Sequence, residues 1–432
     1  MNYKQTLDYL YNKLPMFSRM GSAAFRKDLV NIKLLCEALG NPHEKFKSIH
    51  VAGTNGKGSV SHMLAAIFQK ASYKTGLYTS PHLYDFRERI KIDGVMLSED
   101  FVVEFVDKIK PLIERLEPSF FEITVAMAFD VFARQQIDIA IIEVGLGGRL
   151  DSTNIITPEL SVITNIGWDH MNMLGSTLEE IAVEKAGIIK PGVPVIIGEL
   201  HPETKPVFEK RASEVNAPLF YAEDMFTDVS YQLYHDHLAV QYKKEDDQLV
   251  NIQTDLTGIY QIQNVGTVLT AVEVLQRLEW KLEEETVRTA LPVAKAITGL
   301  MGRWDVIHQN PTIILEVAHN KNGIEKMLAH LNQISFHYLH IVMGVVKDKD
   351  VEQIFALLPK SATYYFTQAH IPRALPAAEL KEKAALMALS GNAFDDVNAA
   401  LQKALEDAAK EDVIIVCGSI FLVAEVDKTL LS

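Results

Sequence analysis

The chain has 432 residues, of which 48% are hydrophobic, and its formal net charge is -14. This length exceeds one ordinary core, so two or three domains are expected, and the acidic balance argues against a nucleic-acid surface. Two cysteines, Cys36 and Cys417, are too few for a disulfide framework or a thiolate metal site, so both are expected to be buried. Without a signal-like N-terminus or a membrane-length apolar run, a cytoplasmic enzyme is expected.

The first 47 residues predict two helices, the second from Phe25 to Leu39. Between them lies the loop FSRMGSAA. It is either a plain surface connection or a cover over a ligand.

Residues 48–61, SIHVAGTNGKGSVS, are the most informative stretch of the chain. An apolar run typical of a strand leads into a glycine-rich turn, and apolar residues then repeat at helical spacing from Val60. Three glycines (53, 56 and 58) allow backbone N–H groups to converge on phosphate oxygens, and the helix N-terminus adds positive charge.

The phosphate loop of G-x-x-x-x-G-K-[ST] type is matched imperfectly by this turn. The spacing from the first glycine to Lys57 is one residue short, and Gly58 separates Lys57 from Ser59. An ordinary glycine turn is the alternative. The strand before, the helix after and the lysine between glycines favour nucleotide phosphate binding.

A short strand, KTGLYT, then leads into SPHLYDFRERIKIDG. Ser80 follows this strand at its carboxyl end, where open α/β sheets bind ligands. Arg87 and Arg89 form a solvated loop face or bind carboxylates. Helices are predicted at 98–118 and from SFFEITVAMAFDVFARQQ, where Glu122 is a helix-terminal carboxylate or a substrate contact.

The run IDIAIIEV predicts a central parallel strand buried on both faces. It ends in Glu143, which is a Mg²⁺ ligand or an acid at the sheet edge. The next strand, ELSVITNIG, precedes Asp169 and His170, and His170 is a metal ligand or a hydrogen-bonded loop residue. A helix containing Lys185 then runs through TLEEIAVEKAGIIKPG and closes at Pro191, before another strand, VPVIIG.

Residues 200–260, including LFYAE, predict a small antiparallel sheet, followed by a helix with Asn264 near its start. Past MGRWD the βα alternation restarts. The sequence therefore predicts an α/β protein with two domains, residues 1–296 and 297–432.

From the residues alone, this is an ATP-binding, Mg²⁺-dependent enzyme with its site at the cleft between two α/β domains. A kinase, an ATPase and an acid-amine ligase remain possible, and so does a nucleotide-gated binding protein without turnover. The glycine spacing of GLGGRL does not fit a dinucleotide fingerprint, and hydrolase and zinc motifs are missing from the sequence.

Nine motifs occur in register along nearly the whole chain: HVAGTNGKGS, GLYTSPHL with FRERIKIDG, IEVGLGGRLDSTN, DHMNMLG, EKAGIIKPG, QIQNV, GVVKDKD, PRALP and GSIFLVAEV. Together they resemble the folylpolyglutamate synthase family of the Mur-ligase superfamily, including bacterial forms that also act as dihydrofolate synthase. The resemblance implies an N-terminal P-loop domain with a mostly parallel sheet and a small antiparallel sheet, and a Rossmann-like C-terminal domain.

The resemblance also implies the chemistry and the residues that carry it. ATP phosphorylates a folate carboxylate, and the amine of L-glutamate attacks the acyl phosphate. The implied ATP-binding residues are Thr54, Asn55, Gly56, Lys57, Gly58, Ser59, Asn264, Arg303 and Glu316. The implied metal ligands are Ser80, Glu143, His170 and Lys185, the last as a carbamate. The implied catalytic residues are Lys57, Lys185, Arg303 and His319. The implied substrate-binding residues are Phe121, Glu122, Thr124, Arg87 and Asp151.

Further expectations concern cofactors and partners. Two Mg²⁺ ions and a monovalent cation are expected beside ATP, with folate and L-glutamate as small-molecule substrates. The protein is expected to be a monomer without nucleic-acid or membrane partners.

Two departures from the family pattern affect these expectations. Where the family reads D-G-A-H-N-P, this chain has EVAHNK, so Glu316 replaces aspartate and Lys321 replaces proline. The extra methylene shifts the reach of the carboxylate by about one bond. The loop from Phe17 to Ala24 lacks the L-G-L-x-R pattern of many bifunctional members, which favours reduced folates over dihydropteroate as the acceptor.

Overall fold

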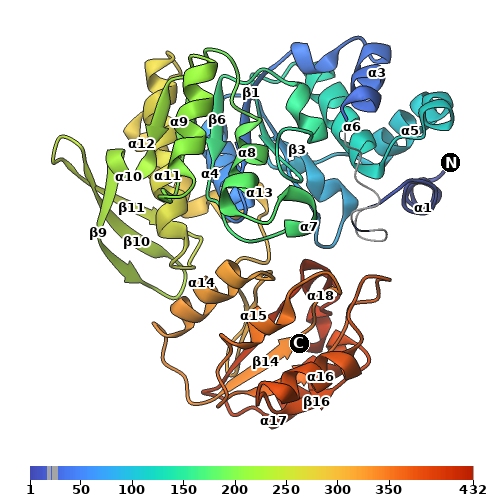
Figure 1. The fold of residues 1–432 in the computed structure, drawn as a ribbon, viewed down its shortest axis with the longest axis vertical. Coiled ribbons are helices and arrows are strands. Elements are labelled where there is room, and N and C mark those ends of the chain that lie inside the picture. The colour runs from blue at the N-terminus through green and yellow to red at the C-terminus, as the bar shows by residue number, and fades with distance from the viewer. Residues whose placement is uncertain (17–20, 22–27, 432) are drawn as a thin grey trace. The chain divides into compact units, whose positions relative to one another are not determined.

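The computed structural model describes residues 1–16, 21 and 28–431, which form two compact units (Figure 1). Unit 1 comprises Met1–Thr257 and Gln261–Leu300, and unit 2 comprises Gly258–Tyr260 and Met301–Ser432. The expected division into domains at 296/297 stays a prediction about independently folding parts. Apart from Gly21, the predicted loop at 17–24 lies outside the described residues, as does the start of the helix predicted from Phe25.

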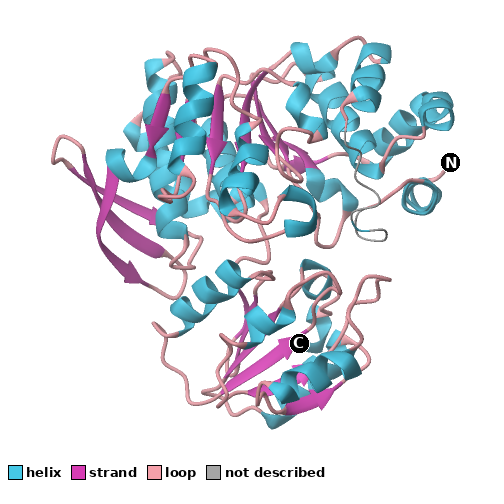
Figure 2. Ribbon diagram, viewed as in Figure 1, coloured by secondary structure: helices cyan, strands magenta, loops and turns pink. Residues whose placement is uncertain are grey.

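The main sheet of unit 1 has, among the described residues, eight strands in the order β4-β3-β2-β5-β1-β6-β7-β8. Figure 2 draws the strands in magenta. They are β1 Lys47–Ala52, β2 Thr75–Tyr78, β3 Ile90–Ile92, β4 Val95–Met96, β5 Ile139–Glu143, β6 Leu160–Ile163, β7 Val195–Ile197 and β8 Leu219–Tyr221. Six neighbouring strands, β2-β5-β1-β6-β7-β8, pair in parallel. Strands β3 and β4 extend the sheet beyond β2 with antiparallel pairing. The predicted mostly parallel sheet is confirmed.

The position of β1 between β5 and β6 decides where a ligand can bind. Because the three strands are parallel, their carboxyl ends meet at one edge of the sheet. Every residue of β5 is buried, as expected for a strand covered on both faces. The segments that follow these three strands therefore lie side by side.

Helices pack around this sheet and around the small sheet of unit 1. They are α1 Tyr3–Lys13, α3 Val30–Ala38, α4 Lys57–Lys70, α5 Glu99–Leu116, α6 Phe120–Arg134, α7 Met171–Leu174, α8 Leu178–Ala186, α9 Lys205–Glu214, α10 Ala222–Met225, α11 Gln261–Arg277, α12 Glu284–Ala290 and α13 Ala294–Thr298, with short 3₁₀ turns at Pro42–Glu44, Phe86–Arg89 (η3), Ser152–Ile155 and Leu291–Val293. One apolar cluster joins α1, α3, α5 and α6 to β2 and β5. Another joins α8 and α9 to β6 and β7.

The small sheet confirms part of the prediction for residues 200–260. Within the described chain, β9 Phe226–Leu233, β10 Leu238–Lys244 and β11 Leu249–Thr254 are antiparallel. The assignment of LFYAE to this sheet is wrong, because β8 pairs in parallel with β7. Helix α9 was not predicted, since only Phe208 and Ala212 are buried along it.

Two predicted helix boundaries are also wrong. Helix α3 begins at Val30, and Leu29 is its non-helical cap residue. Helix α8 ends at Ala186, before Pro191, because Gly187 caps it and the Arg149 backbone N–H donates to the Glu184 carbonyl at 2.8 Å. A Cβ at Gly187 would collide with the Arg149 backbone, so the loop after β5 packs directly on the end of α8.

Unit 2 is a smaller α/β unit with, in its described part, six strands in the order β12-β13-β17-β14-β15-β16. The strands are β12 Asp305–His308, β13 Thr312–Leu315, β14 Leu339–Met343, β15 Thr363–Phe366, β16 Gly391–Ala393 and β17 Val413–Cys417. The helices are α14 Lys321–Leu331, α15 Val351–Phe355, α16 Ala377–Leu386, α17 Val397–Asp407 and α18 Ile420–Val423, followed by a 3₁₀ turn at Lys428–Leu431. Among these six described strands, β12 pairs antiparallel with β13, and the other pairings are parallel.

Two expectations from composition can be checked directly. Cys36 and Cys417 are buried free thiols, as predicted. Over the described ranges, no helix combines the length and apolar character needed to span a membrane.

Candidate active site

The glycine-rich turn connects β1 to α4, which begins at Lys57. Gly56 precedes the helix with φ of 83°, and no side chain caps the first turn. A Cβ at Gly53 would collide with Thr164, and a Cβ at Gly56 would collide with the Asn264 side chain. The turn therefore requires glycine at both positions, and the partial positive charge at the N-terminus of α4 suits an anion.

Residues after β6 hold the start of this turn. Asn165 accepts hydrogen bonds from the Thr54 N–H through its carbonyl, at 3.0 Å, and from the Asn55 N–H through its side chain, at 2.8 Å. These two N–H groups are therefore occupied within the protein, and the phosphate-binding roles of Thr54 and Asn55 stay predictions. The sequence prediction missed Asn165, although it follows a predicted strand at the correct end for a ligand site.

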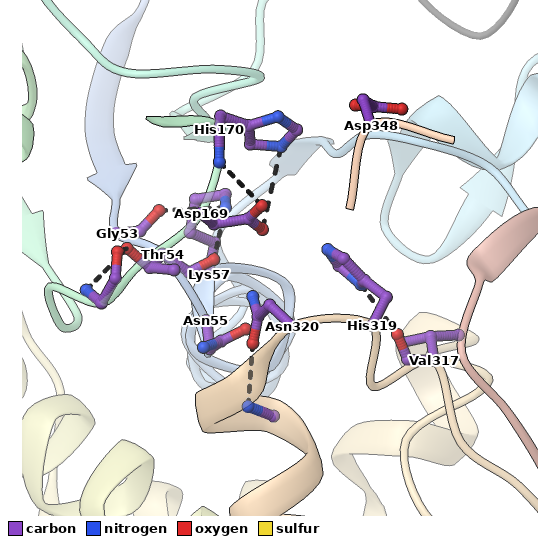
Figure 3. A network of polar contacts seen from close by, with 12 residues as sticks. Gly53, Thr54, Asn55, Lys57, Asp169, His170, Val317, His319, Asn320 and Asp348 are labelled. Carbon is purple, nitrogen blue, oxygen red and sulfur yellow. Dashed lines mark hydrogen bonds and ion pairs between the residues drawn. The ribbon is translucent and has the colours of Figure 1, made fainter. Parts of the chain in front are cut away.

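Two lysines converge on one carbonyl of the turn. Lys57 Nζ donates to the Gly53 oxygen at 3.0 Å and to the Thr54 oxygen at 3.1 Å (Figure 3). Lys185 Nζ donates to the same Gly53 oxygen at 2.8 Å. Lys185 is buried, and burial followed by repulsion from Lys57 lowers its pKa to about 7. Desolvation of Lys185, which a carbamate requires, is thus present.

The neighbouring strand end carries Glu143, which is buried. Its Oε2 accepts a hydrogen bond from the Ser80 N–H at 3.2 Å, so the segment after β2 is tied to the end of β5. The prediction that Ser80 and Glu143 lie at one sheet edge agrees with this contact. Their roles as metal ligands stay predictions.

His170 follows β6 in a left-handed backbone conformation, with φ of 50°. Its N–H donates to Asp169 Oδ1 at 2.8 Å, and its Nε2 lies 3.8 Å from Asp169 Oδ2 (Figure 3). The negative charge of Asp169 also acts on Lys185, where it favours the protonated amine. Asp169 is therefore a site residue that the sequence-based set omits.

The predicted metal ligands do not form an all-protein cage. Across the described residues, no three His, Cys, Asp or Glu side chains are grouped to hold a metal ion. Of the four predicted ligands, only Glu143 and His170 belong to these residue types. Mg²⁺ at this edge would complete its shell with hydroxyl, phosphate and water oxygens, which it prefers.

Two side chains of α11 lie beside the phosphate turn. Asn264 Nδ2 donates to Gln261 Oε1 at 2.8 Å, and Gln261 Nε2 donates to Ser59 Oγ at 3.1 Å. Ser59 is buried in this chain of bonds. The structure thus brings Asn264 to Gly56, as its predicted role requires, and adds Gln261 to the site.

The predicted substrate segment lies at the start of α6. Glu122 Oε2 accepts from the Ser119 N–H at 2.6 Å and from Ser119 Oγ at 2.9 Å, which is the helix-capping alternative. Thr124 Oγ1 lies 2.9 Å from the Tyr78 hydroxyl. The Phe121 ring lies where a Cβ on Gly145 would collide with it.

The other two predicted substrate contacts have partners within the protein. Asp151 is buried, which raises its pKa, and it accepts from the Leu146 N–H at 2.8 Å and from Thr153 Oγ1 at 2.6 Å. Arg87 pairs with Asp85, with Nη2 2.7 Å from Oδ2. Both residues hold loops around the site, and their contacts with substrate stay predictions.

The predicted residues of unit 2 lie around the end of β13. Buried Glu316 accepts from the Tyr260 hydroxyl at 2.7 Å, the Trp304 N–H at 3.0 Å and the Ala318 N–H at 3.2 Å. Burial raises its pKa. His319 Nδ1 lies 2.9 Å from the Val317 carbonyl (Figure 3), and Arg303 Nη1 donates to the Gly302 carbonyl at 3.3 Å.

Comparison with known proteins identifies the family. The Mur ligase middle domain model matches residues 51–272, and the Mur ligase, glutamate ligase domain model matches residues 302–420. The dihydrofolate synthase/folylpolyglutamate synthase of Bacillus subtilis is 33% identical over 93% of this chain and 94% of its own length. The folylpolyglutamate synthase of Lacticaseibacillus casei is 32% identical over 100% of this chain and 99% of its own.

Solved structures give the same result. The Escherichia coli FolC protein in complex with DHPP and ADP superposes with a TM-score of 0.86 at 30% identity, covering 100% of this chain and 98% of that one. The Mycobacterium tuberculosis folylpolyglutamate synthase complexed with ADP gives a TM-score of 0.89 at 29% identity, with the same coverage of 100% and 98%. The chain therefore belongs to the Mur ligase family, in the group of folylpolyglutamate and dihydrofolate synthases.

Proposed function

We propose that this protein is an ATP-dependent ligase that adds L-glutamate to the γ-carboxylate of tetrahydrofolate or its polyglutamates. The observation that carries the proposal is the pair of lysines on the Gly53 carbonyl, beside the uncapped start of α4 and one strand away from buried Glu143. This arrangement favours polyanionic phosphate over a neutral ligand. The ADP complexes of the solved relatives support ATP as the phosphoryl donor.

In the first step, a carboxylate oxygen of the acceptor attacks the γ-phosphorus of ATP. The bond from that phosphorus to the ADP oxygen breaks, ADP leaves, and an acyl phosphate forms. The reaction gathers negative charge on the phosphoryl oxygens, so its barrier depends on positioning and on positive charge. The Lys57 ammonium and the N–H groups of α4 supply that charge.

In the second step, the amine nitrogen of L-glutamate attacks the acyl carbon. The carbon–oxygen bond to phosphate breaks, inorganic phosphate leaves, and the nitrogen loses a proton to give the amide. The protein contributes chiefly by holding the amine against the acyl phosphate.

Mg²⁺ would screen the charge of the phosphate oxygens, and Ser80, Glu143 and His170 would hold it. These residues fit, because a buried carboxylate, a hydroxyl and an imidazole lie on neighbouring strand ends. Lys185, with its pKa near 7, is neutral often enough to take up CO₂ as a carbamate, which would replace a cation with an anion. A monovalent cation is also proposed, with no ligand assigned.

The remaining roles rest on the matched family motifs. Asn264, Arg303, Glu316 and His319 are proposed for the nucleotide and its transferred phosphate. Phe121, Glu122, Thr124, Arg87 and Asp151 are proposed for the folate. We propose a cytoplasmic monomer acting on small molecules alone.

The test is product formation with purified protein, ATP, Mg²⁺, L-glutamate and tetrahydrofolate. We expect ADP in proportion to a product one glutamyl unit heavier by mass spectrometry. ATP turnover without the acceptor and without this product would identify a plain ATPase. Tight ATP binding without turnover, whichever acceptor is added, would identify a binding protein.

A second candidate activity is the joining of L-glutamate to dihydropteroate. It is supported by the 33% identity to the Bacillus subtilis protein, whose name includes dihydrofolate synthase. The missing L-G-L-x-R pattern at 17–24 favours tetrahydrofolate instead. Parallel assays with the two acceptors under identical conditions decide between one activity and both.

A further inference from the structure

The loop between β2 and β3 contains two arginines in opposite surroundings. The Arg87 guanidinium makes a two-point contact with Asp85, from Nε to Oδ1 at 3.0 Å and from Nη2 to Oδ2 at 2.7 Å. Glu99 lies 3.7 Å from the same Nη2. The positive charge of Arg87 is therefore balanced by acids of the protein itself.

Arg89, two residues later, is buried, and its direct contacts are with neutral groups, although the negative charge of Glu143 acts on it from beyond ion-pair distance. Its exposed fraction is 6%. Its Nε donates to His82 Nδ1 at 2.7 Å, and its guanidinium carbon lies 5.2 Å from the centre of the Phe120 ring. In the described part of the chain, no carboxylate oxygen lies within ion-pair distance of Arg89.

The partner His82 cannot balance the charge of Arg89. Burial, together with the charge of Arg89, lowers the pKa of His82 to about 3, so its ring is neutral near pH 7. Because an arginine Nε only donates, His82 accepts at Nδ1 and carries its proton on Nε2. The hydrogen bond fixes the orientation of the guanidinium and leaves its net charge unchanged.

A buried guanidinium without an acid in direct contact is costly. Arginine stays protonated in proteins, so it cannot shed its charge as a buried lysine does. Burial does lower the pKa of Arg89, which indicates that the charged form is disfavoured where it lies. An anionic ligand would relieve this cost.

The surroundings of Arg89 indicate which ligand this is. Its carbonyl accepts from the Thr79 N–H at 3.0 Å, next to Ser80, which contacts Glu143. On its other side, Phe120 begins α6 directly before the predicted folate-binding segment. Arg89 therefore lies between the proposed phosphoryl-transfer edge and the proposed folate site, where the acceptor's acidic end must pass.

We propose that Arg89 binds a carboxylate of the acceptor substrate, and that His82 positions it by occupying Nε. With Nε occupied, the carboxylate pairs with the two terminal Nη groups, in the parallel geometry that favours arginine over lysine. This inference rests on the proposed function and assigns the carboxylate-binding role to Arg89, which the family-derived residue set does not contain.

The test uses the full-length protein with Arg89→Leu and Arg89→Lys. We expect both variants to raise the KM for the acceptor by about 10- to 100-fold, as expected for a charged hydrogen-bonded contact, with little change in the KM for ATP. Arg89→Lys should recover only a small part of the acceptor binding that Arg89→Leu loses, because an ammonium cannot make the paired contact. An unchanged acceptor KM in both variants would overturn the inference.

The two acceptors identify which carboxylate is bound. Tetrahydrofolate carries a reacting and a non-reacting carboxylate, whereas dihydropteroate carries only the reacting one. A rise in KM that is confined to tetrahydrofolate assigns Arg89 to the non-reacting carboxylate. An equal rise in KM with both acceptors assigns it to the reacting carboxylate. Both results support the inference.

Two controls separate binding from folding and from the proposed function. Arg134→Leu removes a largely exposed arginine of α6 that pairs with Asp130, and it should leave every KM unchanged. If Arg89→Leu fails to fold, Arg89→Lys keeps the charge and still gives the KM comparison. A wild-type protein without ligase product would overturn the proposed function, whereas an active wild type with unaffected Arg89 variants would overturn only this inference.

Discussion

Glu143 and Glu316 occupy equivalent places in the two units, and their surroundings differ. Each is buried and comes at the carboxyl end of a parallel strand, β5 in unit 1 and β13 in unit 2. Glu316 accepts three hydrogen bonds from its own unit, from Tyr260, Trp304 and Ala318. Glu143 contacts the Ser80 N–H at an edge where two lysines meet.

This difference shows that position in the fold does not decide what a strand-end acid does. The donors around Glu316 offset part of the cost of burying it, and its hydrogen bond with Tyr260 helps to fix that segment. Glu143 lies among groups that also suit phosphate and Mg²⁺. We therefore expect the two acids to respond differently to substitution.

The largest expected effect is on activity, in Glu143→Gln. The amide keeps an oxygen for the Ser80 N–H but removes the negative charge, so ligase turnover should fall about 100-fold or more. Turnover and thermal unfolding should be measured together. Comparable activity in Glu143→Gln and wild type would contradict the active-site role of Glu143.

The next effect concerns Lys185 on the same edge. Lys185→Ala should lower the ligase activity about tenfold or more. Added short-chain carboxylic acids should restore part of that activity by replacing the carbamate. Activity that is unchanged by the substitution would remove the carbamate proposal. Lys190→Ala is a matched control, because Lys190 is a second lysine with a lowered pKa that the proposed reaction does not use.

The buried amine of Lys185 also predicts a pH dependence of stability. Its folded pKa of about 7 lies below the ordinary value of 10.5, so between these pH values the unfolded chain binds more protons. The free energy of unfolding should therefore rise from pH 7 to 10.5 in wild type relative to Lys185→Met. Parallel denaturant titrations of both proteins in CO₂-free buffer, where Lys185 carries no carbamate, check this, and identical pH profiles would contradict the buried amine.

The smallest effect is expected in unit 2, from Tyr260→Phe. Removing the hydroxyl takes one of three donors from Glu316, which should cost about 1–2 kcal/mol of unfolding free energy. Tyr338→Phe is the matched control, because its hydroxyl is at an exposed contact 3.3 Å from Thr363. Equal stability of the two variants would show that Glu316 does not depend on Tyr260.

Much of the fold could be predicted because the buried strands are continuous apolar runs. IDIAIIEV and ELSVITNIG gave β5 and β6, and the turn between β1 and α4 followed from its glycines. Helix α9 could not be found, because only two of its residues face the core. Strand β8 resembles a hairpin strand locally, and only its pairing with β7 places it in the main sheet.

Candidate site residues could be named where a residue type alone implies chemistry, as with Lys57 and Glu143, whose roles stay predictions. The role of a residue could not be predicted where it depends on neighbours that are distant in the sequence or come from another element. Arg87 and Arg89 lie in the same loop, and their neighbours distinguish them: Asp85 and Glu99 lie beside Arg87, whereas His82 and Phe120 lie beside Arg89. Similarly, the hydrogen bond from the Asn55 N–H to the Asn165 side chain joins positions 110 residues apart.

The two constraints on Gly56 bear on how this sequence can change. Its left-handed backbone disfavours any side chain, and Asn264, far along the chain, fills the space that a side chain would need. A smaller residue at 264 would relieve the crowding but not the torsional strain. No single compensating mutation can therefore make another amino acid acceptable at position 56. Substitution at position 264 is in turn limited by the close contact with Gly56.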